Sequence, residues 1–270
     1  MELDYIKEKD DLGTRLIWIA EGWDGDRFRS YLDSFDRDFR AGNAIYDKRN
    51  LLTRIEPNKE LGIKEDIAVK KFKLTRTYDK LRFCFLDSKA VRSLKIALAL
   101  EEIGVKTPSP VAVVEKRGKF NKLLYSYFIT EYVDYDYNLL DIAKDYDHSL
   151  RNKLKDWLPQ IARDVKRMHQ AGVVHNDLHA GNILVKLTEE KPEFYYIDLN
   201  RGRIKSNLSQ KQRVKDLARF KLTSEEKEIF MEYYAPQHHQ ELLDLMIKQR
   251  ERRQRLRQFK KKVRSLLGVR

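Results

Sequence analysis

Two polar loops, each bordered by apolar residues, carry the side chains whose types and spacing suit chemistry. The first loop lies within the strand-like run 174–184 and contains Asp177 and Asn182. The second follows the apolar, β-rich run 195–197 and begins with Asp198. A carboxylate can orient an attacking hydroxyl and accept its proton, and amide and carboxylate oxygens are ligands that Mg²⁺ prefers. We therefore expect phosphoryl transfer, with Asp177 at the hydroxyl and Asn182 and Asp198 at the metal.

The spacing of these residues resembles the protein-kinase-like superfamily. His175, Asp177 and Asn182 match its catalytic loop, which has the form His-x-Asp-x-x-x-x-Asn. Asp198 stands where the metal-binding Asp of that superfamily follows the loop. A lone His-x-Asp is more often a turn with a capping Asp. The matches at several correct spacings favour the catalytic interpretation.

Within that superfamily, the chain is similar to the bacterial lipopolysaccharide core kinases, which act on Kdo or heptose. The similarity lies in Asp177-Leu-His-Ala-Gly-Asn182 followed by Ile-Leu, in the run 197–204, and in Asp-Leu-Ala-Arg at 216–219. It extends over roughly residues 45–235. The resemblance implies an ATP-dependent kinase, a transferase of lipopolysaccharide biosynthesis that phosphorylates a Kdo or heptose hydroxyl and uses ATP with Mg²⁺.

The same resemblance implies a bilobal, protein-kinase-like α+β fold with a small β-rich N-lobe and a mostly helical C-lobe. We expect residues 1–133 to form the N-lobe with an N-terminal extension and the hinge, 134–247 the C-lobe with the catalytic loop, and 248–270 a basic amphipathic helix. In the N-terminal part, the expected elements are a frayed or weakly helical start at 1–12, a strand at 15–20, a helix at 26–40 closed by Gly42 whose aromatic stripe is core, paired strands at 50–56 and 65–72, a helix capped by Ser88, and strands at 108–114 and 123–130. In the C-terminal part, they are a helix capped by Ser149 that ends near 168, a helical stretch at 217–234 with Ser224 as a cap for the part from Glu225 onward, and a helix at 240–264.

Three residues are expected to bind the nucleotide. The run Ala68-Val69-Lys70 is similar to the Ala-x-Lys of kinase strand three, which implies that Lys70 pairs with the α- and β-phosphates of ATP. Lys71 is the alternative, because successive strand residues face opposite sides. The resemblance also implies that the backbone carbonyl of Glu131 and the backbone amide of Val133 bind the adenine edge.

The sequence departs from the superfamily pattern at two points. No Gly-rich loop precedes Lys70, and Lys48, Arg49 and backbone amides are the candidates to cover the phosphates instead. The acid that pairs with Lys70 cannot be assigned, because Ser93 and Lys95 occupy the middle of the following helix. These departures keep a catalytically silent, nucleotide-binding scaffold at the membrane as an alternative of a different class.

Three histidines accompany the catalytic loop. His179 stands where protein kinases often carry Lys, and contact with the γ-phosphate and bracing of the loop are both open roles for it. We expect His175 to pack or to hydrogen-bond to backbone near Asp198, and His169 to be structural. Asp216 is expected either to buttress the loop or to cap its own helix.

The segment after Asp198 indicates the class of acceptor. Only about 13 residues separate it from the next helical run at Lys211, so the activation segment with which kinases grip a peptide is missing. Arg201, Arg203 and Lys205 suit an acidic sugar or a phosphorylated acceptor. The alternatives are a kinase of another small molecule or of a protein. These cations disfavour an aminoglycoside, and the sequence does not distinguish Kdo from heptose.

Composition bears on the location of the protein. The chain has 270 residues, of which 41% are hydrophobic, enough for a core. Its single cysteine, Cys84, cannot form an internal disulfide, which fits a reducing cytoplasm. No apolar run is long enough for a transmembrane helix, and the N-terminus lacks the features of a signal peptide. We expect a cytoplasmic protein, peripheral on the inner face of the bacterial inner membrane.

The C-terminal segment carries most of the net charge. Residues 248–270 hold eleven Lys or Arg against one acid, Glu251, which is +10 of the net +13. Leu256, Phe259 and Val263 mark one face among these cations. The pattern is typical of a helix on an anionic membrane surface. Packing on the large lobe and a nucleic-acid arm are the alternatives. The expected partners are the inner-membrane surface and a lipid A precursor that bears Kdo or heptose, with no nucleic acid.

Overall fold

The strands in the N-terminal part of the chain form an antiparallel sheet, in which the strand Pro110–Arg117 is buried along almost its whole length. Among the residues that the structure describes, whose ranges are given in the next paragraph, the sheet has seven strands in the order β1-β2-β6-β7-β5-β4-β3. They are β1 (Ile6–Asp10), β2 (Gly13–Ile19), β3 (Asn43–Asp47), β4 (Asn50–Ile55), β5 (Ile67–Phe72), β6 (Pro110–Arg117) and β7 (Leu123–Glu131). The expectation of a frayed or weakly helical start at 1–12 is therefore wrong, because β1 pairs there with β2.

The computed structural model describes residues 3–39, 42–47, 50–74 and 77–266. Lys48 and Arg49, the candidates to cover the phosphates, lie outside these described residues. Contacts divide the chain into two compact units. The first holds Met1–Asp134 together with Asp198–Arg201, and the second holds Tyr135–Ile197 and Gly202–Arg270. The short segment Asp198–Arg201 therefore belongs to the first unit, whereas the residues on either side of it in the sequence belong to the second.

The aromatic stripe that follows β2 forms part of the core of the first unit. Helix α1 (Asp26–Asp33) contributes buried Phe28 and Tyr31, and Phe35 just after it is also buried. Phe35 stands edge-on to Tyr127 of β7, with ring centroids 5.0 Å apart. The stripe is therefore core, as expected.

Helix α1 is shorter than expected. It ends at Asp33 instead of continuing to residue 40. The reason is a turn in which Asp36 Oδ1 accepts the backbone N–H groups of Asp38 and Phe39, each at 2.7 Å. Gly42 precedes β3 and does not close the helix.

Two further helices complete the first unit. Helix α3 (Lys89–Glu102) begins as expected, because Ser88 Oγ accepts the Val91 N–H at 3.1 Å. Helix α2 (Thr77–Arg82) was not expected from the sequence.

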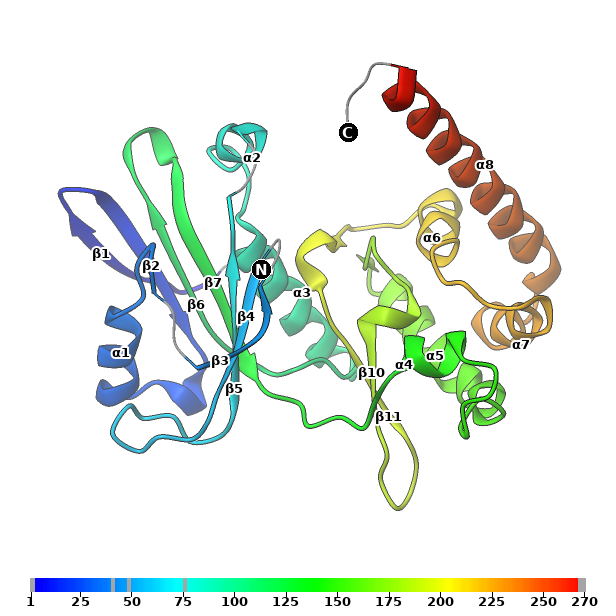
Figure 1. Cartoon of the computed structure of the whole chain (residues 1–270), viewed down its shortest axis with the longest axis horizontal. Coiled ribbons are helices and arrows are strands. Elements are labelled where there is room, and N and C mark those ends of the chain that lie inside the picture. Colours follow the sequence, from blue (N-terminus) through cyan, green and yellow to red (C-terminus); the bar gives the residue numbers. More distant parts are fainter. Residues whose placement is uncertain (1–2, 40–41, 48–49, 75–76, 267–270) are drawn as a thin grey trace. The chain divides into compact units, whose positions relative to one another are not determined.

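The second unit is mostly helical (Figure 1). Its helices are α4 (Leu139–Lys144), α5 (Lys153–Gln170), α6 (Gln210–Leu217), α7 (Ser224–Tyr234) and α8 (His239–Leu266). The strands β8 (Tyr137–Asn138), β10 (Ile183–Lys186) and β11 (Glu193–Tyr196) pair in the order β11-β10-β8, and β9 (Val173–Val174) pairs with β12 (Arg203–Ile204). The expected division into a β-rich N-terminal region and a helical C-terminal part is confirmed.

Two helix starts in the second unit differ from expectation. Helix α5 is buried along its apolar face as predicted, but it begins after Asn152 and not after Ser149. The stretch expected to be helical at 217–234 is divided, and the N-cap of α7 is Thr223, one residue before the cap expected at Ser224. There the Thr223 hydroxyl accepts the Glu226 N–H at 3.2 Å, and the Glu226 carboxylate accepts the Thr223 N–H at 2.8 Å. This capping box starts a new helix.

Helix α8 confirms the long helix expected at 240–264. Its first half packs on α6 and α7 (Figure 1), where Leu242, Leu243 and Met246 are buried. Further along, Leu256 and Phe259 are 52% and 66% exposed. Within the ranges that the structure describes, no helix has the length and apolar character needed to cross a bilayer.

Candidate active site

Hydrogen bonds of His175 hold in place the loop of the second unit that contains Asp177. The His175 backbone N–H donates to Asp216 Oδ2 at 2.9 Å, and its ring Nε2 donates to the Ile197 carbonyl at 3.0 Å. Ring Nδ1 accepts the Asp177 N–H at 3.2 Å, which requires the proton on Nε2. The expected hydrogen bond between His175 and the backbone is confirmed. Of the two roles considered for Asp216, the structure shows the first, because its carboxylate supports the loop.

Each of the two loops contains a non-glycine residue in the left-handed region of backbone conformation. Asn176 has φ 61° and Asp198 has φ 60°. Asn and Asp tolerate this region best among residues with a side chain. Strained backbone of this kind clusters at functional sites. The geometry therefore favours a functional role for both loops.

The Asp177 carboxylate is paired with an arginine. Arg219 Nη1 lies 2.6 Å from Asp177 Oδ1, and the two side chains are only 20% and 16% exposed. Asn182 Nδ2 donates a hydrogen bond to the Asp177 backbone carbonyl at 3.0 Å. This contact distinguishes the two ends of the Asn182 amide, since Nδ2 is the donor that faces the carbonyl and Oδ1 is the acceptor atom. The structure therefore brings Asp177 and Asn182 together. Arg219 was not predicted as a site residue, although it closes the Asp-Leu-Ala-Arg run of the sequence.

Lys70 and Asp198 meet in the first unit. Lys70 Nζ lies 2.6 Å from Asp198 Oδ1, and Asn200 donates to the same oxygen. Lys71 lies on the opposite side of β5, where its ammonium donates to the Arg37 carbonyl. The partner of Lys70, which the sequence left unassigned, is thus Asp198. The role of Lys70 toward ATP stays a prediction.

The backbone groups expected to bind adenine follow the end of β7. The Tyr132 N–H donates to the Asp66 carbonyl at 2.7 Å. The Glu131 side chain accepts a hydrogen bond from Trp23 Nε1 at 3.4 Å. The side chain of Glu131 therefore has a structural partner. The Glu131 carbonyl and the Val133 amide stay the predicted adenine contacts.

Asp177 and His179 open onto a cavity of ≈ 650 Å³ that lies wholly within the second unit. Small-molecule sites typically measure about 300–1,000 Å³. Among the described residues, the lining includes six Lys or Arg and two acids, namely Lys144, Arg219, Lys221, Arg250, Arg253 and Arg257 with Asp177 and Glu226. Each acid has an arginine partner, Arg219 for Asp177 and Arg151 for Glu226. The cavity is therefore cationic and suits an anionic ligand.

His179 lies against the loop beside a glycine. A Cβ at Gly181 would stand 3.1 Å from the Cε1 and Nδ1 atoms of the imidazole. The missing side chain at Gly181 therefore leaves room for the ring. Because His179 lines the same cavity as Asp177, contact with a phosphate and bracing of the loop both stay predictions.

The cations expected beside the site are not the ones that line the cavity. Arg201 belongs to the first unit, and Arg203 and Lys205 are absent from the described lining. The lining cations come instead from α4, from the segment before α7, and from α8. Sequence reasoning missed them, although the lining positions 250, 253, 254 and 257 follow the spacing of one helix face.

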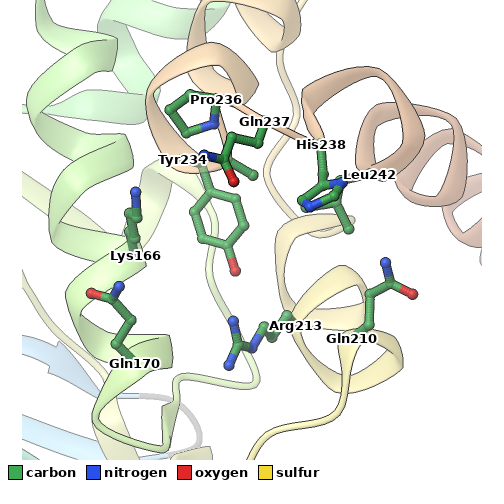
Figure 2. Close-up of a pocket in the computed structure, with 10 residues that line it drawn as sticks. Lys166, Gln170, Gln210, Arg213, Tyr234, Pro236, Gln237, His238 and Leu242 are labelled. Atoms are coloured by element: carbon green, nitrogen blue, oxygen red, sulfur yellow. The ribbon is translucent and has the colours of Figure 1, made fainter.

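A second cavity of ≈ 510 Å³ adjoins the network that holds the loop (Figure 2). Lys166, Arg213 and Tyr234 line it. The Tyr234 hydroxyl lies 2.7 Å from His169 Nδ1, and His169 Nε2 lies 3.4 Å from Asp216 Oδ2. Burial raises the pKa of Tyr234, which keeps the hydroxyl neutral. His169 is structural, as expected, and links Tyr234 in the wall of this cavity to Asp216, which supports the loop that contains Asp177.

The residues expected to hold metal were Asn182 and Asp198. Within the described part of the chain, no three or more His, Cys, Asp or Glu side chains gather as a metal site. An amide and a carboxylate oxygen are hard ligands, and Mg²⁺ usually completes its shell with water and phosphate oxygens. The donor chemistry therefore fits Mg²⁺ that arrives with a nucleotide.

Comparison with known proteins places these features in context. The model of the lipopolysaccharide kinase (Kdo/WaaP) family matches residues 68–259. A protein of Haemophilus influenzae strain KW20/Rd named 3-deoxy-D-manno-octulosonic acid kinase is 26% identical over 124 residues, which are 46% of this chain and 49% of that protein. Its namesake from strain PittGG is 29% identical over 156 residues, 56% and 61% of the two chains. The chain thus spans about half the length of the curated relatives it matches.

A solved structure shares the fold. It is titled WaaP in complex with acyl carrier protein and superimposes with a TM-score of 0.63 at 22% identity, over 87% of this chain and 98% of that one. The expected protein-kinase-like fold is confirmed.

Proposed function

The chain belongs to the lipopolysaccharide kinase (Kdo/WaaP) family, and on this premise we propose that it transfers a phosphoryl group from ATP to a Kdo or heptose hydroxyl of the lipopolysaccharide inner core. One observation carries the proposal. Asp177, held by Arg219 at 2.6 Å, faces a cationic cavity of a size that suits a sugar acceptor. A carboxylate fixed in this way can orient a hydroxyl group for attack and accept its proton late.

We assign the remaining roles from the chemistry of the side chains. Lys70 pairs with the ATP phosphates, and Asn182 and Asp198 hold Mg²⁺, which neutralises phosphate charge when bound. The backbone of Glu131 and of Val133 binds adenine. The 2.6 Å contact between Lys70 and Asp198 supports these roles, because it sets a phosphate-binding cation beside a metal-binding carboxylate.

We further propose that the protein works in the cytoplasm, on the inner face of the inner membrane, and receives a lipid A precursor there. The exposed Leu256 and Phe259 of α8 support this location, since apolar side chains among cations suit an anionic bilayer surface. Their exposure also disfavours the alternative that these two residues serve to pack against the rest of the second unit. Leu256→Ser with Phe259→Ser should weaken sedimentation with anionic vesicles, and unchanged sedimentation would reject the membrane role.

Phosphate transfer tests the proposed activity directly. Kdo-bearing and heptose-bearing lipid A precursors are offered in parallel with ATP and Mg²⁺, and EDTA and Asp177→Ala serve as controls. We expect transfer to one precursor, lost in both controls, with ATP binding retained in Asp177→Ala. Intact ATP binding without transfer to either precursor would refute the proposal and favour another acceptor or a silent scaffold.

A further inference from the structure

Helix α8 directs one row of cationic side chains to the cavity that contains Asp177. Arg250, Arg253 and Arg257, here called the inner row, line it together with Gln254. Residues at these spacings share one helix face. Within the inner row, Arg250 and Arg253 are half-buried and Arg257 is exposed. Arg252 and Arg255, here called the outer pair, are exposed and absent from the described lining.

The described lining of the cavity carries more positive than negative charge, with six Lys or Arg against two acids. Asp177 is paired with Arg219, and the buried carboxylate of Glu226 is paired with Arg151 from outside the lining. The local effect of this charge extends to a neighbour, because burial and the positive charge of Arg250 lower the pKa of the Lys227 ammonium. Like charges gathered in a partly buried space repel one another, and a bound anion relieves that repulsion.

We propose that the inner row binds an anionic group of the acceptor, a sugar carboxylate or a phosphate, and thereby positions the acceptor hydroxyl at Asp177. The inference rests on the proposed function, which supplies the acceptor. Arginine suits this task because its planar guanidinium binds a carboxylate or phosphate through two parallel hydrogen bonds. The basic C-terminal helix then has a role in substrate binding that is separate from contact between Leu256 or Phe259 and a bilayer.

Two charge-matched double variants of the same helix test the inference. Arg250→Gln with Arg253→Gln removes two charges of the inner row, and Arg252→Gln with Arg255→Gln removes two charges of the outer pair. The acceptor, dispersed in detergent, is titrated calorimetrically into each protein, and KM is measured for the acceptor and for ATP. Circular dichroism checks that both variants fold.

The inner-row variant should bind the acceptor at least about tenfold more weakly, because loss of a charge-assisted contact is worth one decade or more. Its acceptor KM should rise while its KM for ATP stays unchanged. The outer-pair variant should remain within about twofold of the wild type for acceptor binding. Replacement of the inner row by Lys should restore part of the affinity, since charge returns without the planar fork. Arg257→Gln supplies the same test should the double variant fail to fold.

The binding of chemically modified acceptors shows whether the inner row binds the carboxylate or the phosphate. If the inner row binds the carboxylate, an acceptor with an esterified carboxylate should bind the wild type weakly and lose little more in the inner-row variant. If it binds phosphate, a dephosphorylated acceptor should behave in this way. Equal acceptor binding by the inner-row and outer-pair variants would overturn the inference. Phosphate transfer by the wild type would then leave the proposed function standing, whereas acceptor binding without transfer would reject that function alone.

Discussion

Arg219→Gln should slow phosphoryl transfer by between about 10- and 150-fold and leave the affinity for ATP unchanged. Arg219 Nη1 lies 2.6 Å from Asp177 Oδ1, and both side chains are at most one-fifth exposed. A hydrogen bond to a charged partner contributes about 1.5–3 kcal/mol. Each ~1.36 kcal/mol changes a rate tenfold, so the expected loss covers one to two decades if the bond orients the carboxylate in the transition state.

The assay measures transfer to the lipid A precursor under saturating ATP and acceptor, well below the unfolding temperature. Arg167→Gln is the matched control. Arg167 also pairs with an aspartate, Asp164, at 2.6 Å in the same unit, but its side chain is 46% exposed and lies outside the described cavity lining. This control should keep nearly the wild-type rate. Arg219→Lys keeps the charge without the fork and should fall between the wild type and Arg219→Gln.

Two results would refute this reasoning. If Arg219→Gln turns over at the wild-type rate, Asp177 does not depend on Arg219 for its position. If Arg167→Gln slows transfer as much as Arg219→Gln, the loss reflects a general effect on the second unit and not the orientation of Asp177. A fluorescent-nucleotide titration must also show unchanged ATP affinity in Arg219→Gln.

Three further predictions address the nucleotide, the backbone and pH. Lys70→Met should weaken ATP binding by at least about tenfold, because one charge-assisted phosphate contact is lost; a nucleotide titration with wild-type affinity would contradict its role. Gly172→Ala should lower the free energy of unfolding by about 1–3 kcal/mol, because Gly172 has φ 76° and a Cβ there would collide with the Lys205 carbonyl oxygen. An unchanged midpoint of urea unfolding would reject this prediction. Burial raises the pKa of the Asp164 carboxyl above its ordinary value near 3.8, against the lowering effect of Arg167. Folding therefore disfavours the ionised form of this carboxyl. The wild type should lose stability relative to Asp164→Asn as the pH rises from below 3.8 through the raised pKa. A difference in the free energy of unfolding between the two proteins that is constant with pH would contradict the shift.

The ends of several elements could not be predicted because two local patterns compete there. The aromatic stripe after Asp26 continues at helical spacing to Phe39, but the Asp36 carboxylate accepts two backbone N–H groups and turns the chain. The apolar run toward Tyr234 is likewise interrupted by the capping box of Thr223, one residue before the cap expected at Ser224. Periodicity alone does not show which pattern wins, because the choice depends on what the following residues pack against.

The sequence by itself determined the features that depend on neighbours along the chain. Asp177 and Asn182 occupy one short loop between two strands, and their spacing indicated both the chemistry and the family. The period of apolar residues in α5 and α8 likewise predicted long helices, because a helix repeats within a few residues.

Only the tertiary structure decided which distant side chains meet. Lys70 pairs with Asp198 across 128 residues, and Arg219 pairs with Asp177 across 42 residues. The run 248–270 reads as one cationic helix, yet the structure divides its arginines between a cavity and solvent. The physical reason is that the interaction energy of a charge depends on which groups lie near it in space. Groups that are distant along the chain come close to one another only when the chain folds.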